Sequence, residues 1–456
     1  MKFVAEACEA EIQRGAAEAL VKNVCTDSRQ AKAGDIFFAI CGENFDGHDF
    51  LSEVAAKNVS AVVVEQNKAP APLPNCAVLI VEDTRIALGK LAAAYRRQFD
   101  LPVICVGGSN GKTTVKELTA SVLRQKFSTL WSEASFNNDI GVPLTLLRLE
   151  KSHQAAVLEA GTNHPGELAP LVKMIQPKIG VITNIGREHL EFFNDVAGVA
   201  REEGWLAELL PADGKLFVNG DNEWTEKMIA RTKAKVIRVG LVKENDWRAD
   251  KFRLDKNGVT FRVQTTKEEF CGEYRINLLG RHQVVNALFA IAVGEELGLG
   301  RAEIQGGLAD CKPPKMRLHF WEANGVRVLD DAYNANADST IAALETLSDL
   351  PLQGRRVAVL GDMEELGIHS ESAHAEVGRR AAELKIGQLF TVGKMAAVTA
   401  KAARDGGLNR VIEFENVELA VTAIRKFLKA GDVVLLKASR ASRLERIAET
   451  LKLEKL

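Results

Sequence analysis

The chain has 456 residues, of which 46% are hydrophobic and 26% are charged, which is typical of globular proteins and excludes disordered or fibrous ones. Because one hydrophobic core rarely serves more than about 300 residues, we expect three domains. The 59 basic and 61 acidic residues give a net charge of -2, which excludes a strong general attraction to nucleic acid or to an anionic membrane.

The cysteine pattern and the N-terminal sequence favour a cytoplasmic protein. The seven cysteines are scattered and never spaced as CxxC, as is typical of reduced thiols. The first residues, MKFVAEACEAEI, carry acidic side chains where a signal peptide needs an unbroken apolar stretch. No run of about 18 apolar residues occurs anywhere. We therefore expect a soluble cytoplasmic protein without membrane insertion.

Two proline-containing segments divide the sequence into three predicted α/β domains. They are FDLPV at 99–103 and DCKPPKM at 310–316, and each is followed by a new strand pattern. A small N-terminal α/β domain therefore covers 1–98. The central domain is expected at 99–312 and the C-terminal domain at 313–456.

The first two domains contain short apolar runs that are typical of buried strands. In the N-terminal domain these are GDIFFAI at 34–40 and SAVVVEQ at 60–66. In the central domain they alternate with helical stretches, which predicts a doubly wound parallel sheet. The central runs are PVICVGG, AAVLEAG, IGVITNIG and GKLFVNGD, which begin at residues 102, 155, 179 and 214. Asn257-Gly258, between two alternating segments, predicts a hairpin and thus an antiparallel flap.

The last third repeats the alternation of strands and helices, which predicts a second, Rossmann-like α/β domain. Its apolar runs are GVRVLDDAYN, RRVAVLGDM, GQLFTVG and DVVLLKAS, which begin at residues 325, 355, 387 and 432.

A glycine-rich loop follows the first central strand. Its spacing leaves three residues between Gly107 and the Gly111-Lys112 pair, one fewer than the general phosphate-binding pattern. Glycines let backbone N–H groups approach a phosphate closely, a lysine adds positive charge and a threonine hydroxyl can bind Mg²⁺. We predict that the loop binds nucleotide phosphates, and the alternative is a structural turn. The predicted phosphate-binding residues are Gly107, Gly108, Ser109, Asn110, Gly111, Lys112, Thr113 and Thr114.

An amphipathic helix is expected directly after the loop. Val115, Leu118, Val122 and Phe127 recur at a spacing that places them on one helix face. The N-terminus of such a helix favours a bound anion because its N–H groups and its dipole point outward.

Polar residues follow the next two predicted strands. Glu159 ends one strand, where its carboxylate could bind Mg²⁺ beside Thr113, and the alternative is a solvated glutamate. Asn184 and His189 follow the other strand, and His189 is a candidate second metal ligand unless it is an ordinary surface histidine. Ligands of open α/β sheets gather at the carboxyl ends of the strands, so these side chains are expected near the loop.

With these residues together, the chain resembles the Mur ligases, the ATP-dependent amide-forming enzymes of peptidoglycan synthesis. The segment at 26–50 is similar to the family's N-terminal nucleotide-sugar module, and GGSNGKTT is similar to its shortened P-loop. NNDIGVP at 137–143, DDAYNANADS at 330–339 and VLGDMEELG at 359–367 resemble the member that adds a D-alanyl-D-alanine dipeptide. The short loop spacing is thus a family form.

The resemblance implies an ATP-dependent amide ligase. ATP would phosphorylate the terminal carboxylate of a UDP-N-acetylmuramoyl-tripeptide, and the amine of D-alanyl-D-alanine would attack the acyl phosphate. Positioning and charge neutralisation would supply most of the acceleration. The expected partners are these small molecules, with Mg²⁺ as cofactor, and we expect a monomer.

The resemblance also implies roles for the phosphate and metal residues. Lys112 would hold the β- and γ-phosphates. Thr113 and Glu159 would bind one Mg²⁺ ion, and His189 would bind a second one.

Further roles concern the rest of ATP and the dipeptide. Asn286 would contact adenine, unless it is simply a polar helix residue. Arg317 would reach ATP from the C-terminal domain, and Asp331 would contact the ribose. The residues implied in binding the dipeptide are Tyr333, Asn334 and Asn336.

The muramoyl substrate is expected to contact the N-terminal and central domains. Asn137 and Asn138 belong to the segment that resembles the dipeptide-adding member and are expected to bind substrate. A further segment, in the N-terminal domain, is implied in binding the uridine diphosphate end of this substrate. The alternative is that this segment forms only a turn or a helix cap with a surface arginine. The residues implied in that site are Thr26, Asp27, Ser28 and Arg29.

One departure from the family pattern affects the metal site. The family carries a carbamylated lysine in a segment like GVAKAKGEIF, whereas this chain has GVAREEGWLA at 198–207, with Glu203 at the position of that lysine. No carbamylated lysine is therefore expected. Glu203 is the shorter, permanently anionic stand-in, which leaves room for a bridging water to the metal, and the alternative is an unrelated surface glutamate. Gly107 stands where the family often has threonine.

Other functions stay open at this point. One is another ligase of the superfamily, which adds a single amino acid to a UDP-muramoyl precursor or glutamate to folate. Another is a catalytically inactive nucleotide-binding relative, since the modified lysine is absent. The third residue of the acceptor peptide is also open.

Overall fold

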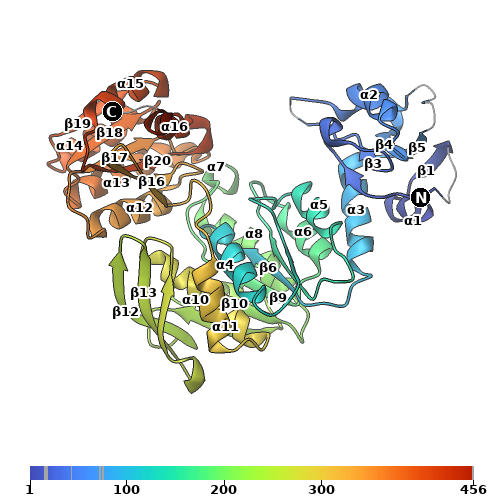
Figure 1. Cartoon of the computed structure of the whole chain (residues 1–456), viewed down its shortest axis with the longest axis horizontal. Coiled ribbons are helices and arrows are strands. Elements are labelled where there is room, and N and C mark those ends of the chain that lie inside the picture. Colours follow the sequence, from blue (N-terminus) through green and yellow to red (C-terminus); the bar gives the residue numbers. More distant parts are fainter. Residues whose placement is uncertain (15–18, 43, 71–72, 74–75, 454–456) are drawn as a thin grey trace.

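The computed structural model describes residues 1–14, 19–42, 44–70, 73 and 76–453. Within them, three separate β-sheets with flanking helices lie one after another along the chain (Figure 1). The N-terminal and C-terminal sheets lie on opposite sides of the molecule, and the central sheet lies between them in the chain. The predicted three-domain α/β fold is confirmed. The exact domain boundaries stay predictions.

The N-terminal sheet has five strands in the order β1-β5-β4-β3-β2, and all neighbouring pairs are parallel except β1 with β5. The strands are β1 (Glu11–Arg14), β2 (Val24–Cys25), β3 (Ile36–Phe38), β4 (Ala61–Glu65) and β5 (Ala77–Val81). The helices are α1 (Lys2–Cys8), α2 (Leu51–Ala56) and α3 (Thr84–Arg96), with short 3-10 turns η1 (Ser28–Gln30), η2 (Gly47–Phe50) and η3 (Gln66–Lys68). Helix α3 contacts both this domain and helices of the central one.

The central sheet has nine strands in the order β14-β13-β12-β11-β10-β9-β6-β8-β7. The strands are β6 (Val103–Gly107), β7 (Thr129–Trp131), β8 (Ala155–Glu159), β9 (Ile179–Ile182), β10 (Lys215–Asn219), β11 (Lys235–Gly240), β12 (Trp247–Asp255), β13 (Gly258–Thr265) and β14 (Gly272–Ile276). The helices are α4 (Lys112–Leu123), α5 (Gly141–Leu146), α6 (Leu168–Ile175), α7 (Leu190–Phe193), α8 (Val196–Glu208), α9 (Thr225–Ile229), α10 (His282–Glu296) and α11 (Arg301–Asp310), with η4 (Glu268–Phe270). The four predicted parallel strands are confirmed as β6, β8, β9 and β10.

The predicted hairpin is β12 and β13, which continue the central sheet in antiparallel fashion. Asp255 pairs with Gly258, so the two-residue turn is Lys256-Asn257, one position earlier than the expected pair. Gly258 instead begins the return strand, with a φ of 153° that residues with a side chain rarely adopt. The local signal therefore located the hairpin but missed its register by one residue.

The C-terminal sheet has six strands in the order β15-β16-β20-β17-β18-β19, parallel except for β15. The strands are β15 (His319–Ala323), β16 (Val326–Asp331), β17 (Arg356–Gly361), β18 (Gln388–Val392), β19 (Val411–Phe414) and β20 (Val433–Lys437). The helices are α12 (Ala337–Asp349), α13 (Ser370–Glu383), α14 (Ala396–Asp405), α15 (Val417–Phe427) and α16 (Glu445–Leu453), with η5 (Gly367–His369) and η6 (Arg440–Ser442).

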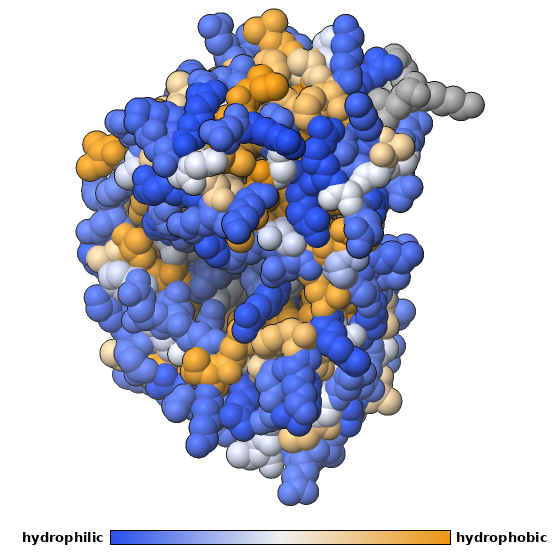
Figure 2. Space-filling view, turned by 90° about the vertical axis from the view of Figure 1, so that its left-hand side faces the viewer, coloured by the Kyte–Doolittle hydropathy of each residue, from blue (hydrophilic) through white to orange (hydrophobic). Residues whose placement is uncertain are grey.

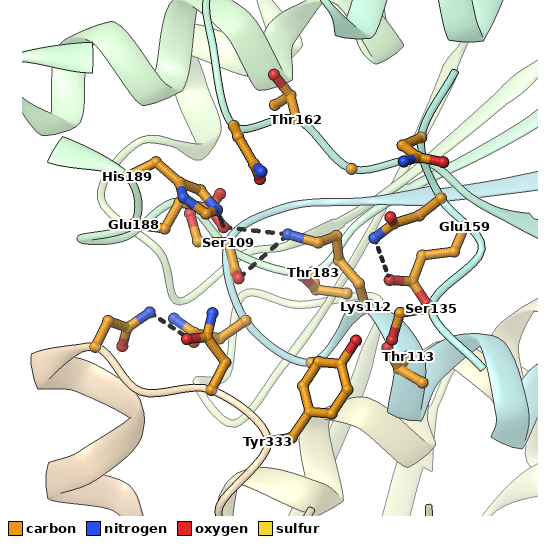
Figure 3. A pocket seen from close by; sticks show the side chains of 18 of the residues that line it. Ser109, Lys112, Thr113, Ser135, Glu159, Thr162, Thr183, Glu188, His189 and Tyr333 are labelled. Carbon is orange, nitrogen blue, oxygen red and sulfur yellow. Dashed lines mark hydrogen bonds and ion pairs between the residues drawn. The ribbon is translucent and has the colours of Figure 1, made fainter. Parts of the chain in front are cut away.

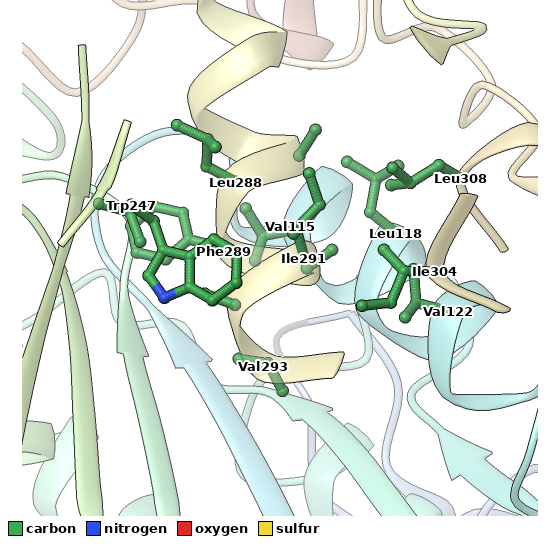
Figure 4. Packing of buried hydrophobic residues seen from close by; sticks show 14 of the residues in the cluster. Val115, Leu118, Val122, Trp247, Leu288, Phe289, Ile291, Val293, Ile304 and Leu308 are labelled. Carbon is green, nitrogen blue, oxygen red and sulfur yellow. The ribbon is translucent and has the colours of Figure 1, made fainter. Parts of the chain in front are cut away.

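The core of the central domain anchors the helix that follows the glycine loop (Figure 4). Val115, Leu118 and Val122 on α4 are fully buried, and α4 packs against α10 and α11. Burying each such side chain contributes about 1.5–3 kcal/mol, so the start of α4 is firmly placed. Phe127 lies beyond the end of α4 and is only partly buried, so its predicted place in the helix is wrong.

The face of the molecule in Figure 2 is mostly hydrophilic, with scattered hydrophobic residues and a hollow near its middle. Among the described helices, none combines the length and the apolar character that a membrane crossing requires.

Candidate nucleotide-binding active site

A cavity of about 1720 Å³ lies at the carboxyl ends of the central strands. Its lining includes Arg85 from α3, Lys112 from the glycine loop and Tyr333 from the C-terminal domain. Residues of all three predicted domains therefore face one space, and Figure 3 shows part of it. The substrates of a reaction inside this cavity can be enclosed by domains on several sides.

The glycine loop has the geometry of a phosphate cradle. It connects β6 to α4, and Gly108 and Gly111 have φ angles of 107° and 86°, which strongly favour glycine. A Cβ atom on Gly108 would lie 2.4 Å from Thr183 Oγ1, so the close approach to β9 also requires glycine. Asn184 holds the loop, because its Oδ1 accepts the Asn110 N–H at 3.0 Å and its Nδ2 donates to Asn110 O at 3.0 Å.

Lys112 lies folded over its own loop. Its Nζ donates to the carbonyl of Gly108 at 2.5 Å and pairs with Glu188 Oε2 at 3.1 Å. Burial lowers the pKa of Lys112, but the charges of Glu188, Glu203 and Glu159 outweigh it and raise the pKa overall. The lysine is therefore a fixed positive charge at the place where phosphates are expected.

The residues predicted to bind the first Mg²⁺ fit such an ion. Thr113 Oγ1 and Glu159 Oε2 are buried and have no hydrogen-bond partner, and both residues line the cavity. The other Glu159 oxygen accepts the amide of Asn137 at 2.9 Å, which orients the carboxylate. Among the described residues, no three His, Cys, Asp or Glu side chains form a metal cage by themselves. This suits Mg²⁺, which takes one or two protein ligands and completes its shell with phosphates and water.

His189 lines the cavity at the start of α7. Its Nδ1 bonds to Glu365 Oε2 of the C-terminal domain, and its Nε2 lies 4.0 Å from Glu188 Oε2. The hydrogen bond from His189 lowers the pKa of Glu365. The histidine predicted from sequence is therefore at the cavity, and a residue from another domain contacts it.

Glu203 lies on α8 and is completely buried, so its interpretation as a surface glutamate is wrong. Its Oε2 accepts the N–H of Gly108 at 2.6 Å, while its Oε1 has no partner. Burial raises the pKa of Glu203 to about 8, so the expectation of a permanently anionic group is wrong. Glu203 is not among the residues that line the cavity, because its carboxylate is bound to the loop backbone instead. Its role as a metal ligand stays a prediction that this placement does not favour.

Glu188 is a cavity residue that the sequence did not single out. It is buried, one of its oxygens pairs with Lys112, and Oε1 has no partner. Its position directly before His189, just after β9, was the signal that could have identified it. Glu188 therefore places a carboxylate at the cavity wall, paired with Lys112.

The residues predicted to contact the nucleoside also line the cavity. Asn286 on α10 approaches the loop closely, since a Cβ on Gly111 would lie 2.7 Å from its Oδ1. Arg317 reaches the central domain, where it donates to Ser135 Oγ at 3.2 Å, and its guanidinium lies 4.3 Å from the centre of the Tyr333 ring. Asp331 pairs with Lys437 at 2.8 Å.

The predicted dipeptide residues lie between the C-terminal domain and the loop. The Asn336 side chain caps α12 and donates to Asn110 Oδ1 at 3.0 Å across the domains. The carbonyl of Asn334 accepts from Lys437 at 2.7 Å. Asn336 and Asn334 line the cavity together with Tyr333. Lys437 thus fixes both Asp331 and the segment of Asn334.

The residues predicted to bind uridine diphosphate are not at the cavity. Asp27 caps η1, accepts the Arg29 N–H at 3.0 Å and pairs with the Arg29 guanidinium, which lowers the pKa of Asp27 to about 2. The segment therefore has the turn with a surface arginine that was given as the alternative to a binding site. Thr26 and Ser28 lie in the same segment, and the N-terminal residues that do line the cavity include Arg85 and Lys90.

The predicted central-domain substrate residues are at the cavity. Asn137 binds Glu159 as described, and Asn138 Oδ1 accepts the Gly141 N–H at 2.9 Å at the start of α5. Both asparagines therefore shape the wall next to the proposed metal ligands.

A glycine loop with a buried lysine, set on a parallel sheet and facing two further domains, defines a P-loop nucleotide-binding protein. Three domain descriptions of one family match the chain. Residues 20–96 match the Mur ligase family, catalytic domain, 106–294 match the Mur ligase middle domain and 316–440 match the Mur ligase, glutamate ligase domain.

Individual proteins are similar over almost the whole chain. The UDP-N-acetylmuramoyl-tripeptide--D-alanyl-D-alanine ligase of Escherichia coli is 36% identical over 433 residues, which cover 94% of this chain and 93% of that protein. The crystal structure of MurF from Acinetobacter baumannii gives a TM-score of 0.90 at 32% identity and covers 99% of this chain and 98% of its own. MurF ligase from Thermotoga maritima, in complex with ADP, gives 0.83 at 26% identity and covers 95% and 98%. The chain belongs to the Mur ligase family.

Proposed function

We propose that this protein joins D-alanyl-D-alanine to a UDP-N-acetylmuramoyl-tripeptide with ATP. The observation that carries the proposal is the full-length likeness to ligases of this name. The cavity supports it, because the phosphate loop, a set of asparagines and a C-terminal wall surround one space. An enclosed space of this kind can hold a nucleotide next to two other substrates.

The reaction proceeds in two substitutions. A carboxylate oxygen of the tripeptide attacks the γ-phosphorus of ATP, and ADP leaves, which gives an acyl phosphate. The amine of the dipeptide then attacks the acyl carbon, and the tetrahedral intermediate releases phosphate and leaves an amide. Phosphorylation is needed because a free carboxylate is a poor electrophile with a poor leaving group.

The loop residues act on the phosphates. Lys112 exchanges its bonds to the loop carbonyls for the β- and γ-phosphates of ATP. The N–H groups at the N-terminus of α4 stabilise the negative charge that is transferred. The residues that form this cradle are Gly107, Gly108, Ser109, Asn110, Gly111, Thr113 and Thr114.

The metal residues neutralise charge. Thr113 and Glu159 would hold one Mg²⁺ ion and His189 a second, and bound Mg²⁺ supplies positive charge next to the phosphates. Glu188, which lines the same cavity and has one oxygen without a hydrogen-bond partner, is proposed as an additional anionic partner in this region.

The remaining residues bind the rest of the substrates. Asn286, Arg317 and Asp331 are proposed to contact the nucleoside of ATP. Tyr333, Asn334 and Asn336 are proposed to bind the dipeptide, with Asn137 and Asn138 at the acceptor carboxylate. The segment from Thr26 to Arg29 is proposed to bind the uridine diphosphate end of the acceptor, outside the cavity.

Phosphate release tests the proposed function. The purified full chain should release phosphate from ATP only when both UDP-N-acetylmuramoyl-tripeptide and D-alanyl-D-alanine are present. Release with a single amino acid, or with folate and glutamate, would instead assign another ligase of the family. Binding of ATP without release, with every substrate pair, would identify a catalytically inactive relative. A panel of tripeptides with diaminopimelate or lysine at the third position determines the acceptor.

We also propose that the protein acts as a monomer in the cytoplasm. Residues of all three domains of one chain line the cavity, which supports a reaction carried out by one copy. Analytical ultracentrifugation at working concentration should give a mass near 49.7 kDa. A dimer mass at nanomolar concentration would contradict this proposal.

A further inference from the structure

The acidic residue Glu365 makes a contact that the proposed roles do not include. It lies between β17 and η5 in the C-terminal domain, within the segment VLGDMEELG. Its carboxylate bonds to Nδ1 of His189, which belongs to the central domain and is 176 residues away in the chain. The cavity histidine is therefore held by a different domain from the one that carries it.

We propose that Glu365 is a positioning residue that fixes the ring of His189 so that Nε2 faces the phosphates when the two domains are together. This inference rests on the proposed function, because it assigns His189 to the metal and phosphate region. It adds a residue from the C-terminal domain to the assembly of that region.

The chemistry of the pair sets the direction of the ring. An ionised carboxylate can only accept a hydrogen bond, so Nδ1 of His189 carries the proton. In the neutral ring, Nε2 then keeps its lone pair free for a metal or an oxygen. Nε2 lies 4.0 Å from Glu188 Oε2, and both residues line the cavity. Carboxylates bound to the far nitrogen commonly orient metal-binding histidines in this way.

The backbone holds both residues in place. His189 and Glu365 have φ angles of 47° and 60°, a region that residues with a side chain populate sparsely. The Glu365 carbonyl accepts the N–H of Glu191 at 3.0 Å, so the two loops are joined by main chain and side chain. This main-chain hydrogen bond joins the same two loops, so two contacts fix the position of Glu365 relative to His189.

The same interface contains a contact that does not involve His189. Arg187 pairs with Asp338 at 2.5 Å and with Glu376 at 2.5 Å, both from the C-terminal domain. Glu376 on α13 therefore holds the domains together without touching the histidine. Its replacement by glutamine is a matched control for loss of an interface carboxylate.

The experiment compares Glu365→Ala, Glu365→Gln and Glu376→Gln in the full chain. We expect Glu365→Ala to lower kcat about 10- to 100-fold, with KM for ATP changed less than about threefold. Glu365→Gln should recover part of the loss, because its amide oxygen still accepts a hydrogen bond from Nδ1. Glu376→Gln should leave kcat within about threefold of the parent.

A second measurement does not depend on turnover. Mn²⁺ is titrated into the full chain with a non-hydrolysable ATP analogue and UDP-N-acetylmuramoyl-tripeptide, and free Mn²⁺ is measured by electron paramagnetic resonance. We expect Glu365→Ala to weaken Mn²⁺ binding about tenfold or more, and Glu376→Gln to leave it unchanged. If the chain proves to have another activity, this titration still tests Glu365, so the two proposals can fail separately.

Two results would overturn the inference. One is an equal loss of Mn²⁺ affinity in Glu365→Ala and Glu376→Gln, which would assign Glu365 to domain docking alone. The other is that Glu365→Ala still causes its full loss of Mn²⁺ affinity in a His189→Ala background. If the glutamate acts through the histidine, its replacement has no further effect there.

Discussion

The carboxylate of Glu203 accepts the backbone N–H of Gly108 at 2.6 Å, so a helix of the central domain supports the phosphate loop. The same carboxylate oxygen would lie 2.9 Å from a Cβ atom on Gly107. Gly107 and Glu203 therefore occupy complementary space. The glycine at this position makes room for a buried acid, whereas its φ does not require glycine.

Replacement of Glu203 separates support of the loop from a metal role. We expect Glu203→Ala to weaken ADP binding about tenfold, because the Gly108 N–H is left buried without a partner, at a cost of about 1–3 kcal/mol. Glu203→Gln keeps an acceptor and should bind ADP within about threefold of the parent. Isothermal titration calorimetry checks both. Equal loss in both variants would contradict a role that needs only a hydrogen-bond acceptor at this position.

Stability should depend on pH through Glu203. Burial raises its pKa from 4.5 to about 8, so between these values the folded chain retains a proton that the unfolded chain has lost. Rising pH therefore favours the unfolded state, and the parent should lose stability relative to Glu203→Gln as the pH rises from about 4.5 to about 8. Thermal unfolding of both proteins at several pH values measures the difference. A difference in Tm that is constant over this range would contradict it.

Gly107→Ala should destabilise the fold by about 1–3 kcal/mol, because the added methyl overlaps the Glu203 carboxylate and approaches Leu206 Cδ2 to 3.2 Å. Chemical denaturation measures the free energy of unfolding. In a double variant that combines Gly107→Ala with Glu203→Asp, the shorter aspartate side chain should partly relieve this overlap. Additive effects of the two replacements would show that the residues do not share this space.

Glu188→Gln should have opposite effects with and without Mg²⁺. Without metal, its charge repels phosphate and competes for Lys112, so its removal should tighten ADP binding about fivefold, or about 1 kcal/mol. With Mg²⁺, the loss of an anionic partner should lower the rate of phosphate release. Calorimetry in EDTA and phosphate release in Mg²⁺ provide the two values. Weaker binding of ADP in EDTA would contradict the expected repulsion.

Local signals predicted much of the fold. The strands around β6, β8, β9 and β10 were recognisable because a buried parallel strand is a short continuous apolar run. The phosphate loop was recognisable because its glycines and lysine are adjacent in sequence. Local signals failed where packing decides, as at the end of α4, which leaves Phe127 outside the helix.

Family resemblance predicted which residues belong to the site but not always where they lie. Lys112, Glu159 and His189 were expected at one cavity, and all three line it. Thr26 to Arg29 do not line the cavity, and the Asp27 carboxylate caps a turn there, so their role at the uridine diphosphate end stays a prediction. A capping motif and a ligand-binding motif use the same residue types, so the sequence alone could not distinguish them.

The sequence by itself determined the three α/β domains, the phosphate loop and the family, because these depend on residues that are close together or on whole segments. Only the tertiary structure placed Glu203 against Gly108, Glu188 against Lys112 and Glu365 against His189. The members of these pairs are 95, 76 and 176 residues apart in the chain. A buried carboxylate takes the partner that long-range packing brings within hydrogen-bond distance, and no local pattern encodes that partner.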